Sequence, residues 1–149
     1  MSRYKIVLEG ASGVGKTRWI QSILNNSAEY TEPTQNTEIN EIVFSTNYGD
    51  YTIEIWEIGG LPYYSNHDKK YYYTDADAVI ILTDNPDDSG ILSHNYGRKL
   101  PRLLVYNGYD SNYYKNTTIV IDEEINLSKP FQVLLRTLTR HGDLVIKNH

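Results

Sequence analysis

The sequence lacks cysteine altogether and has one methionine and two phenylalanines among its 149 residues. The absence of cysteine excludes disulfide bonds, cysteine-ligated zinc, prenylation and palmitoylation. No apolar run approaches the ~20 residues that cross a bilayer, and the N-terminal residues lack the apolar core of a signal peptide. We therefore expect a cytoplasmic protein with no membrane anchor, stabilised by packing.

Positive charge is also scarce. The formal net charge is −5, and no run of Lys and Arg is longer than two residues, as at Lys69 and Lys70. A protein that binds nucleic acid needs clustered basic side chains to neutralise the phosphate backbone. We therefore expect no nucleic-acid partner.

Tyrosine, in contrast, is abundant. There are fourteen tyrosines, concentrated in residues 63–73 and 108–116. Tyrosine is common at protein interfaces because an apolar ring carries a polar tip. A drift of composition toward Tyr, Asn and Ile explains the same count, so both readings stay open.

Apolar patterns alternate between strand and helix. Residues 4–9 form a short apolar run before a glycine, as in a buried parallel strand. Residues 16–26 carry apolar side chains at helical spacing. Residues 41–57 are two β-rich runs joined by turn chemistry at Asn47 and Gly49, which predicts a hairpin.

The second half continues this alternation. The runs 76–84, 102–107 and 117–122 are apolar on both faces, as in central strands covered on both sides. Residues 126–142 then predict a helix, with Ser128 as its cap, Pro130 in its first turn, an apolar face of Phe131, Leu134, Leu135 and Leu138, and Gly142 as its stop.

These elements predict one α/β domain over residues 1–149. Its central sheet is expected to be mostly parallel, with one antiparallel hairpin strand.

The strongest motif is "GASGVGKT", residues 10–17, which matches G-x-x-x-x-G-K-[ST] between a strand and a helix. In this loop backbone N–H groups surround phosphates, and the start of the helix adds positive potential. Lys16 is expected to reach the β- and γ-phosphates, and the Thr17 hydroxyl to ligate Mg²⁺. The predicted phosphate-binding residues are Gly10, Ser12, Gly13, Val14, Gly15, Lys16 and Thr17, which predicts the P-loop NTPase fold.

Together with "IEIWEIGG" and "NGYD", this motif makes the chain resemble the small GTPases of the Ras superfamily, with Rab and Arf proteins nearest in style. The resemblance runs in order from about residue 4 to about residue 140. It implies GTP or GDP as ligand and Mg²⁺ as cofactor. It also implies a Mg²⁺ threonine after the first helix, which is Thr34 in "EPT", with Thr31 and Thr37 as alternatives.

The segment "EIGG" resembles the D-x-x-G motif of the family. Glu57 then stands for the carboxylate that holds a Mg²⁺ water, and Gly60 for the glycine that contacts the γ-phosphate. Glu57 keeps the charge of the aspartate and adds a methylene. Leu61 follows where the family usually has the glutamine that orients the attacking water, which implies very slow hydrolysis.

The segment "NGYD" resembles N-K-x-D, the guanine-specificity motif. Asp110 is expected to accept the N1 and N2 protons of guanine, and Asn107 to tie the base loops together. Gly108 replaces the lysine whose stem covers one face of the base, and Ser27 falls where an aromatic covers the other. The third base loop falls near residues 124–126, where Ile125 offers only its backbone.

Two connections are too short or too broken for the helices of the family. Twenty residues separate Leu82 from Leu103 and carry two prolines and two glycines, and seven separate Asp110 from Thr118. A crossover with its helix takes about 10–12 residues or more. The third and fourth helices of the family are therefore expected to be shortened or absent.

Loss of these helices would leave one apolar face of the sheet without its usual cover. A large uncovered apolar face marks an interface. We therefore expect a protein partner or a homodimer on this face, or a covering loop lined with Tyr72, Tyr73, Tyr96, Tyr113 and Tyr114.

Three functions compete at this stage. The first is a reduced small GTPase that binds GTP or GDP with Mg²⁺, hydrolyses slowly or not at all, and acts as a switch or GTP-locked binding module. The second is a pseudoGTPase interaction module with weak or no nucleotide binding. A small nucleotide kinase is the third, but the sequence offers no Arg-rich lid for one.

Overall fold

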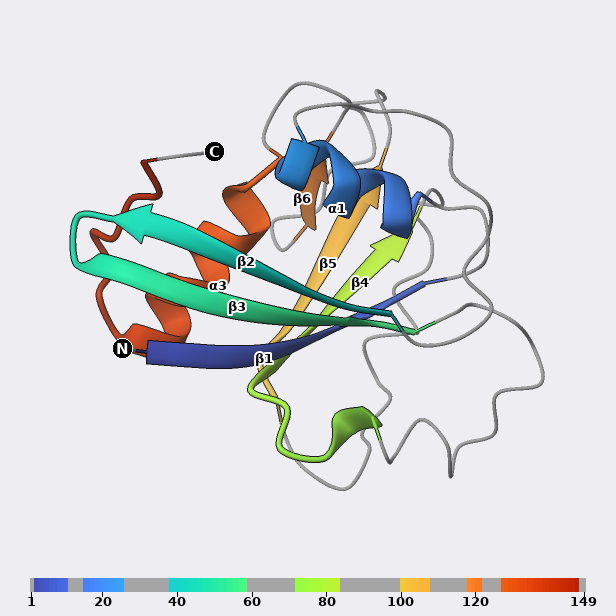
Figure 1. Cartoon of the computed structure of the whole chain (residues 1–149), viewed down its shortest axis with the longest axis horizontal. Helices are drawn as coiled ribbons and strands as arrows, with labels where there is room; N and C mark the ends of the chain where they lie inside the picture. The colour runs from blue at the N-terminus through green and yellow to red at the C-terminus, as the bar shows by residue number, and fades with distance from the viewer. Residues whose placement is uncertain are drawn as a thin grey trace.

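The computed structural model describes residues 2–10, 15–25, 38–58, 72–83, 100–107, 118–121 and 127–147. Within these ranges the chain forms six strands and two helices (Figure 1). They follow in the order β1 Ser2–Glu9, α1 Lys16–Asn25, β2 Glu38–Thr46, β3 Gly49–Glu57, β4 Ala78–Thr83, β5 Arg102–Asn107, β6 Thr118–Ile121 and α3 Lys129–Thr139.

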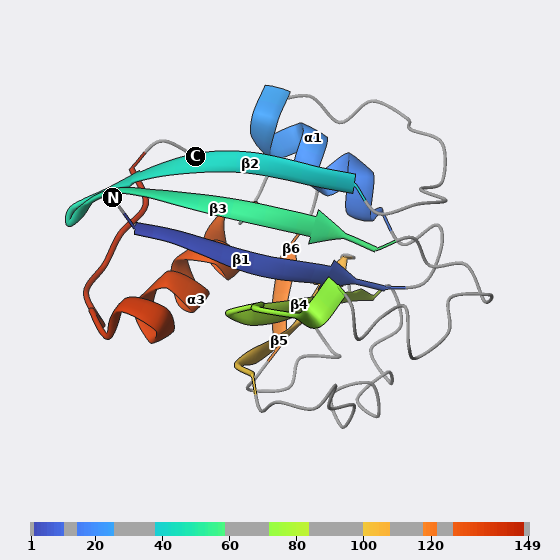
Figure 2. The ribbon, with the colours of Figure 1, turned by 60° about the horizontal axis from the view of Figure 1, so that its bottom comes forward.

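All six strands join in one sheet with the order β2-β3-β1-β4-β5-β6. Five strands run parallel, and β2 pairs antiparallel with β3. Figure 2 shows β1 between β3 and β4. The predicted α/β class, mostly parallel sheet and antiparallel hairpin are confirmed. The apolar run of β4 is buried along its whole length, as expected of a central strand.

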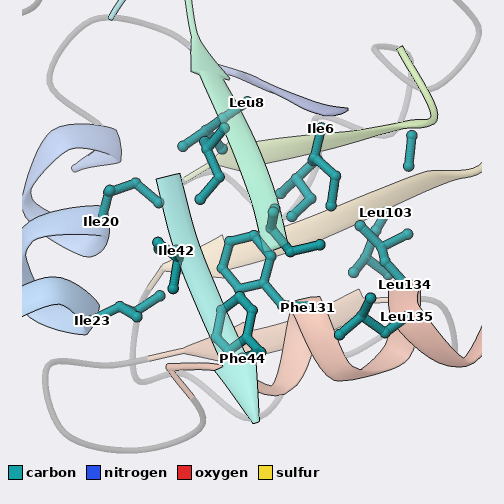
Figure 3. Close-up of a cluster of buried hydrophobic side chains, with 14 of the residues drawn as sticks. Ile6, Leu8, Ile20, Ile23, Ile42, Phe44, Leu103, Phe131, Leu134 and Leu135 are labelled. Atoms are coloured by element: carbon teal, nitrogen blue, oxygen red, sulfur yellow. The ribbon is translucent and has the colours of Figure 1, made fainter. Parts of the chain in front are cut away.

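One face of the sheet packs against both helices and holds the larger core. Phe131 of α3 lies at its centre, with its ring centroid 5.3 Å from that of Phe44 on β2 and 5.2 Å from that of Trp19 on α1. Figure 3 shows Ile20 and Ile23 of α1 and Leu134 and Leu135 of α3 directed at the same sheet face. This cluster holds α1, and with it the residues that begin the helix, against β1.

The opposite face carries a smaller cluster that includes Val7, Val79 and Leu104. Tyr73 is buried in this cluster, and Tyr72 packs against it. Part of this face is therefore covered by the tyrosine segment, one of the two expected covers. Tyr96, Tyr113 and Tyr114 lie outside the described residues, so the rest of that expectation stays a prediction.

Two connections were expected to be too short or too broken for their usual helices. Residues 84–99, between β4 and β5, and residues 108–117, between β5 and β6, lie outside the described part of the chain. In the residues that are described, α1 and α3 are the helices that the sequence predicted around residues 16–26 and 126–142.

The ends of α3 differ from their predicted caps. Ser128 occupies the N-cap position, but its backbone is helical and its hydroxyl makes no capping hydrogen bond. The helix stops at Thr139, because Arg140 adopts a left-handed conformation with φ 59°. Gly142, the predicted stop, comes two residues beyond it. The prediction was wrong because it assigned the left-handed position to the nearest glycine.

The C-terminal segment fastens the turn between β2 and β3. Lys147 donates its backbone N–H to the Ser45 carbonyl at 2.7 Å, and the Tyr48 hydroxyl donates to Asp143 at 2.5 Å. The rings of Tyr48 and His141 stack with centroids 3.9 Å apart. In Figure 1 this segment runs beside the hairpin turn, away from the carboxyl ends of the parallel strands.

Candidate nucleotide site

The candidate site lies where β1 and β3 end side by side. The two strands are parallel, and Leu8 is in register with Glu57. The backbone N–H of Ile58 continues this pairing by donating to the Leu8 carbonyl at 3.1 Å. The arrowheads of β1 and β3 point the same way in Figure 2. Ligands of open α/β sheets bind at this edge, near the strand where the connections change direction, which here is β1.

Gly15 turns the chain from the loop into α1. Its φ of 99° lies in the left-handed region, where a side chain would be strained, so the motif needs a glycine here. The Gly15 carbonyl accepts the first hydrogen bond of the helix, from the Trp19 N–H at 2.9 Å. The sharp turn and the immediate start of the helix direct the N-terminus of α1 toward the loop.

Lys16 is the central cation of the site. Its ammonium donates to the Gly10 carbonyl at 2.7 Å, and the side chain is only 6% exposed. Burial lowers the pKa of Lys16, and the carboxylates of Glu57 and Glu9 oppose this by favouring the charged form. A buried ammonium carries a full positive charge and several N–H donors, which suits it to bind phosphate oxygens.

Thr17 and Glu57 supply the oxygen atoms beside it. The Thr17 hydroxyl donates to the Glu57 carboxylate, and Glu57 is completely buried. Mg²⁺ prefers hard oxygen ligands and is usually held by one or two protein groups together with waters and substrate phosphates. A hydroxyl and a carboxylate in contact at the mouth of a phosphate loop fit this requirement. In the described residues no group of three or more His, Cys, Asp or Glu side chains offers another such site.

Asn107 ends β5 at the same edge. It is in register with Ile121, the last residue of β6, and β4 separates β5 from β1. With strands about 4.8 Å apart, two strand spacings place Asn107 roughly 10 Å to the side of the phosphate loop.

The remaining predicted site residues lie outside the described ranges. They are Ser12, Gly13 and Val14 of the phosphate loop, Thr34 and its alternatives Thr31 and Thr37, Gly60 and Leu61 after β3, and Gly108, Asp110 and Ile125 of the base loops. Of the predicted set, the structure brings together Gly10, Gly15, Lys16, Thr17 and Glu57.

One pair of residues near the site was not predicted. Glu9 is the last residue of β1, and its carboxylate accepts a hydrogen bond from the Tyr73 hydroxyl at 2.5 Å. The signal for Glu9 was present in the sequence, since a carboxylate interrupts an apolar run directly before the first glycine of the motif. Its pairing with Tyr73 joins residues 64 positions apart, and no local pattern reveals such a contact.

Among the described residues, no helix is both long enough and apolar enough to cross a membrane.

Comparison with known proteins gives a consistent result. The family described as Ras of Complex, Roc, domain of DAPkinase matches residues 5–110. The chain is 29% identical over 91 residues to ADP-ribosylation factor-like protein 5 of Caenorhabditis elegans, a match that covers 60% of the chain and 47% of that protein. It is 26% identical over 117 residues to human ADP-ribosylation factor-like protein 5A, covering 72% of the chain and 63% of that protein.

A further match lies within a larger protein. The chain is 31% identical over 83 residues to the E3 ubiquitin-protein ligase arc-1 of Caenorhabditis elegans, a match that covers 54% of the chain and 14% of that protein. The chain thus covers less than two thirds of the length of each of these relatives.

Proposed function

This chain belongs to the Roc family of Ras-like GTPase domains, a GTP-binding family within the Ras superfamily, and we propose that it binds GTP and GDP together with Mg²⁺. The observation that carries the proposal is the double contact at the carboxyl ends of β1 and β3. There Lys16 bonds to the Gly10 carbonyl, and Thr17 bonds to the buried Glu57. The groups proposed to bind phosphate and those proposed to bind metal are thereby held side by side.

Each of these residues has a defined part in the proposal. The Gly10 carbonyl accepts a hydrogen bond from the Lys16 ammonium, which would pair with the β- and γ-phosphates. Thr17 and Glu57 would hold Mg²⁺, the threonine as a direct ligand and the carboxylate through a coordinated water. When bound, Mg²⁺ neutralises the charge shared by the β- and γ-phosphate oxygens.

Guanine selectivity is proposed to come from the loop that follows β5. Asn107 ends that strand at the edge shared with the phosphate loop. Asp110, three residues later, would accept the two guanine protons that adenine does not present. Gly108 and Ser27 supply no side chain to stack on the base, so we expect the preference for guanine to be kept and the affinity to be reduced.

Slow or absent hydrolysis is proposed from Leu61. An aliphatic side chain can neither donate a hydrogen bond to the attacking water nor accept one from it. The bound triphosphate would then persist, so the protein would act as a slow switch or a GTP-locked binding module.

Thermal unfolding with GTP, GDP and ATP in the presence of Mg²⁺ tests this proposal. A ligand at about 100 times its dissociation constant stabilises the folded state by ~2.7 kcal/mol, so binding should raise the melting temperature visibly. Stabilisation should be larger for guanine nucleotides and should disappear in Lys16→Ala. Lys129→Ala, which removes an exposed lysine on α3, is the matched control and should respond like the wild type.

The alternative is a pseudoGTPase interaction module. If no nucleotide shifts the melting temperature of the wild type, this alternative replaces the proposed nucleotide binding.

A protein partner or a homodimer is also proposed, on the sheet face opposite α1 and α3. On β2, Ile39 and Val43 of this side are 55% and 45% exposed, and Trp56 of β3 is partly buried. Sedimentation at micromolar and higher concentrations tests the homodimer. A single monomeric species throughout would exclude self-association and leave only a different protein as the partner.

A further inference from the structure

Glu9 places a carboxylate at the base of the phosphate loop. It ends β1 in register with Ile81 of β4, and the next residue, Gly10, gives its carbonyl to the Lys16 ammonium. A negative charge beside a loop that receives phosphates opposes the binding of an anion. The position of this residue therefore needs a reason beyond the stability of the strand.

The direction of the Glu9 side chain follows from the strand. Val7 belongs to the smaller apolar cluster and Leu8 to the larger one, and alternate residues of a strand share a face. Glu9 thus lies on the face of Val7, with Ile81 as its neighbour across the ladder. This is also the face on which Tyr73 is buried.

Tyr73 fixes the carboxylate in that place. Its hydroxyl donates to Glu9 Oε2 at 2.5 Å, while its ring is only 8% exposed. The segment that carries Tyr73 is itself anchored to β1. The Asp77 N–H donates to the Lys5 carbonyl at 2.8 Å, and the Lys5 N–H donates to the Asp77 carboxylate at 2.8 Å. Glu9 is therefore a fixed charge and not a mobile surface group.

Lys16 lies within the electrostatic reach of two carboxylates, Glu9 and Glu57. In the proposed function Glu57 contributes to the Mg²⁺ site, so its charge is compensated when the metal binds. Glu9 is not in that ligand set, so the metal does not compensate its charge.

Resting on the proposed nucleotide binding, we propose that Glu9, held by Tyr73, is a specificity-determining residue that weakens binding of the triphosphate more than of the diphosphate. The physical reason is the additional negative charge of the γ-phosphate, since repulsion by a fixed carboxylate grows with the charge of the ligand. The site would then prefer the diphosphate over the triphosphate more strongly than the same site without the Glu9 carboxylate.

The test is the ratio of the dissociation constants for a non-hydrolysable GTP analogue and for GDP, measured by titration calorimetry with Mg²⁺. Glu9→Gln should tighten the binding of both ligands and should shift the ratio toward the triphosphate by about three- to ten-fold. Glu41→Gln makes the same change of net charge on β2, at an exposed position. It should leave the ratio within about two-fold of the wild type.

Two further variants separate charge from packing. Glu9→Asp keeps the charge, so its ratio should stay closer to the wild type than to Glu9→Gln. Tyr73→Phe keeps the carboxylate but releases it from its hydrogen bond, so its ratio should shift in the same direction as in Glu9→Gln and by less. A wild-type ratio in Glu9→Gln, or the full shift of Glu9→Gln in the charge-keeping Glu9→Asp, would overturn the proposal while nucleotide binding stands. An unchanged ratio in Tyr73→Phe would overturn the part given to Tyr73. Failure of the wild type to bind either ligand would overturn both.

Discussion

Glu57 is the residue on which the proposed metal site depends. It is completely buried, and the Thr17 hydroxyl donates to it. Glu57→Gln keeps the shape and an acceptor for this bond but removes the charge. We expect the gain in GDP affinity produced by Mg²⁺ to fall about ten-fold, the lower range for outer-shell groups of a metal.

The measurement is GDP binding with Mg²⁺ and with a chelator present. Glu41→Gln, on the exposed side of β2, serves as the control and should keep the full Mg²⁺ effect. An unchanged Mg²⁺ effect in Glu57→Gln would show that this carboxylate takes no part in the metal site.

Leu61 is the residue proposed to limit hydrolysis of GTP. Leu61→Gln introduces a side chain that can orient water, so single-turnover hydrolysis of GTP should rise if the rest of the site is intact. The readout is release of phosphate from preloaded protein, with Leu61→Met as an apolar control. Equal rates in all three proteins would place the limitation elsewhere, with Glu57 the first candidate.

At the scale of residues, the sequence predicted those candidate site residues that form a short, continuous motif. Gly10, Gly15, Lys16 and Thr17 were predicted from one octapeptide, and Glu57 from the resemblance, and the fold brings these residues together. Glu9 was passed over because its partner, Tyr73, is distant in the chain and contacts it only through the sheet. Short motifs carry their own geometry, whereas contacts across strands depend on the register.

Among the elements, α3 contributes the aromatic centre of the core. Phe131 is fully buried between Phe44 and Trp19. Phe131→Ala should lower the free energy of unfolding by about 3–5 kcal/mol, because it removes buried area and leaves a cavity. In a domain whose total stability is of order 5–15 kcal/mol, this brings the chain close to unfolding.

Urea denaturation measures this change. Lys129→Ala at the start of the same helix is exposed and should stay within about 0.5 kcal/mol of the wild type. A loss under about 1 kcal/mol in Phe131→Ala would mean that α3 does not pack on the sheet as described.

At the C-terminal end of α3, a substitution is expected to stabilise the protein. Arg140 has φ 59°, a conformation that costs roughly 1–2 kcal/mol for a residue with a Cβ and little for glycine. Arg140→Gly should therefore raise the free energy of unfolding by about 0.5–1 kcal/mol. Arg140→Ala loses the same charge and keeps the strain, so it should not stabilise the protein, and equal stability of the two variants would contradict the explanation.

The elements themselves were predicted more accurately than their ends. Each of the strands and both helices of the described ranges coincide with a predicted segment, because apolar periodicity reports burial directly. The caps of α3 were predicted from residue type alone. The Ser128 hydroxyl makes no capping hydrogen bond, and the left-handed position falls at Arg140, which is not a glycine.

At the scale of the whole molecule, the order of the strands determines where the candidate site residues lie along the edge of the sheet. The chain crosses from β3, on one side of β1, to β4 on the other. Gly10, directly after β1, therefore lies between the ends of β3 and β4, with Glu57 on one side and Asn107 on the other. The sequence predicted a mostly parallel sheet but not the order of its strands, since no single segment encodes its neighbours.

The central claim is that this arrangement binds a guanine nucleotide with Mg²⁺. Titration calorimetry that measures the binding of GDP and of ADP separately tests this claim most directly. The account predicts one site per chain, tighter binding of GDP than of ADP in the presence of Mg²⁺, and loss of the signal in Lys16→Ala but not in Lys129→Ala. Absence of binding to the folded wild-type protein, or equal binding by Lys16→Ala, would contradict it.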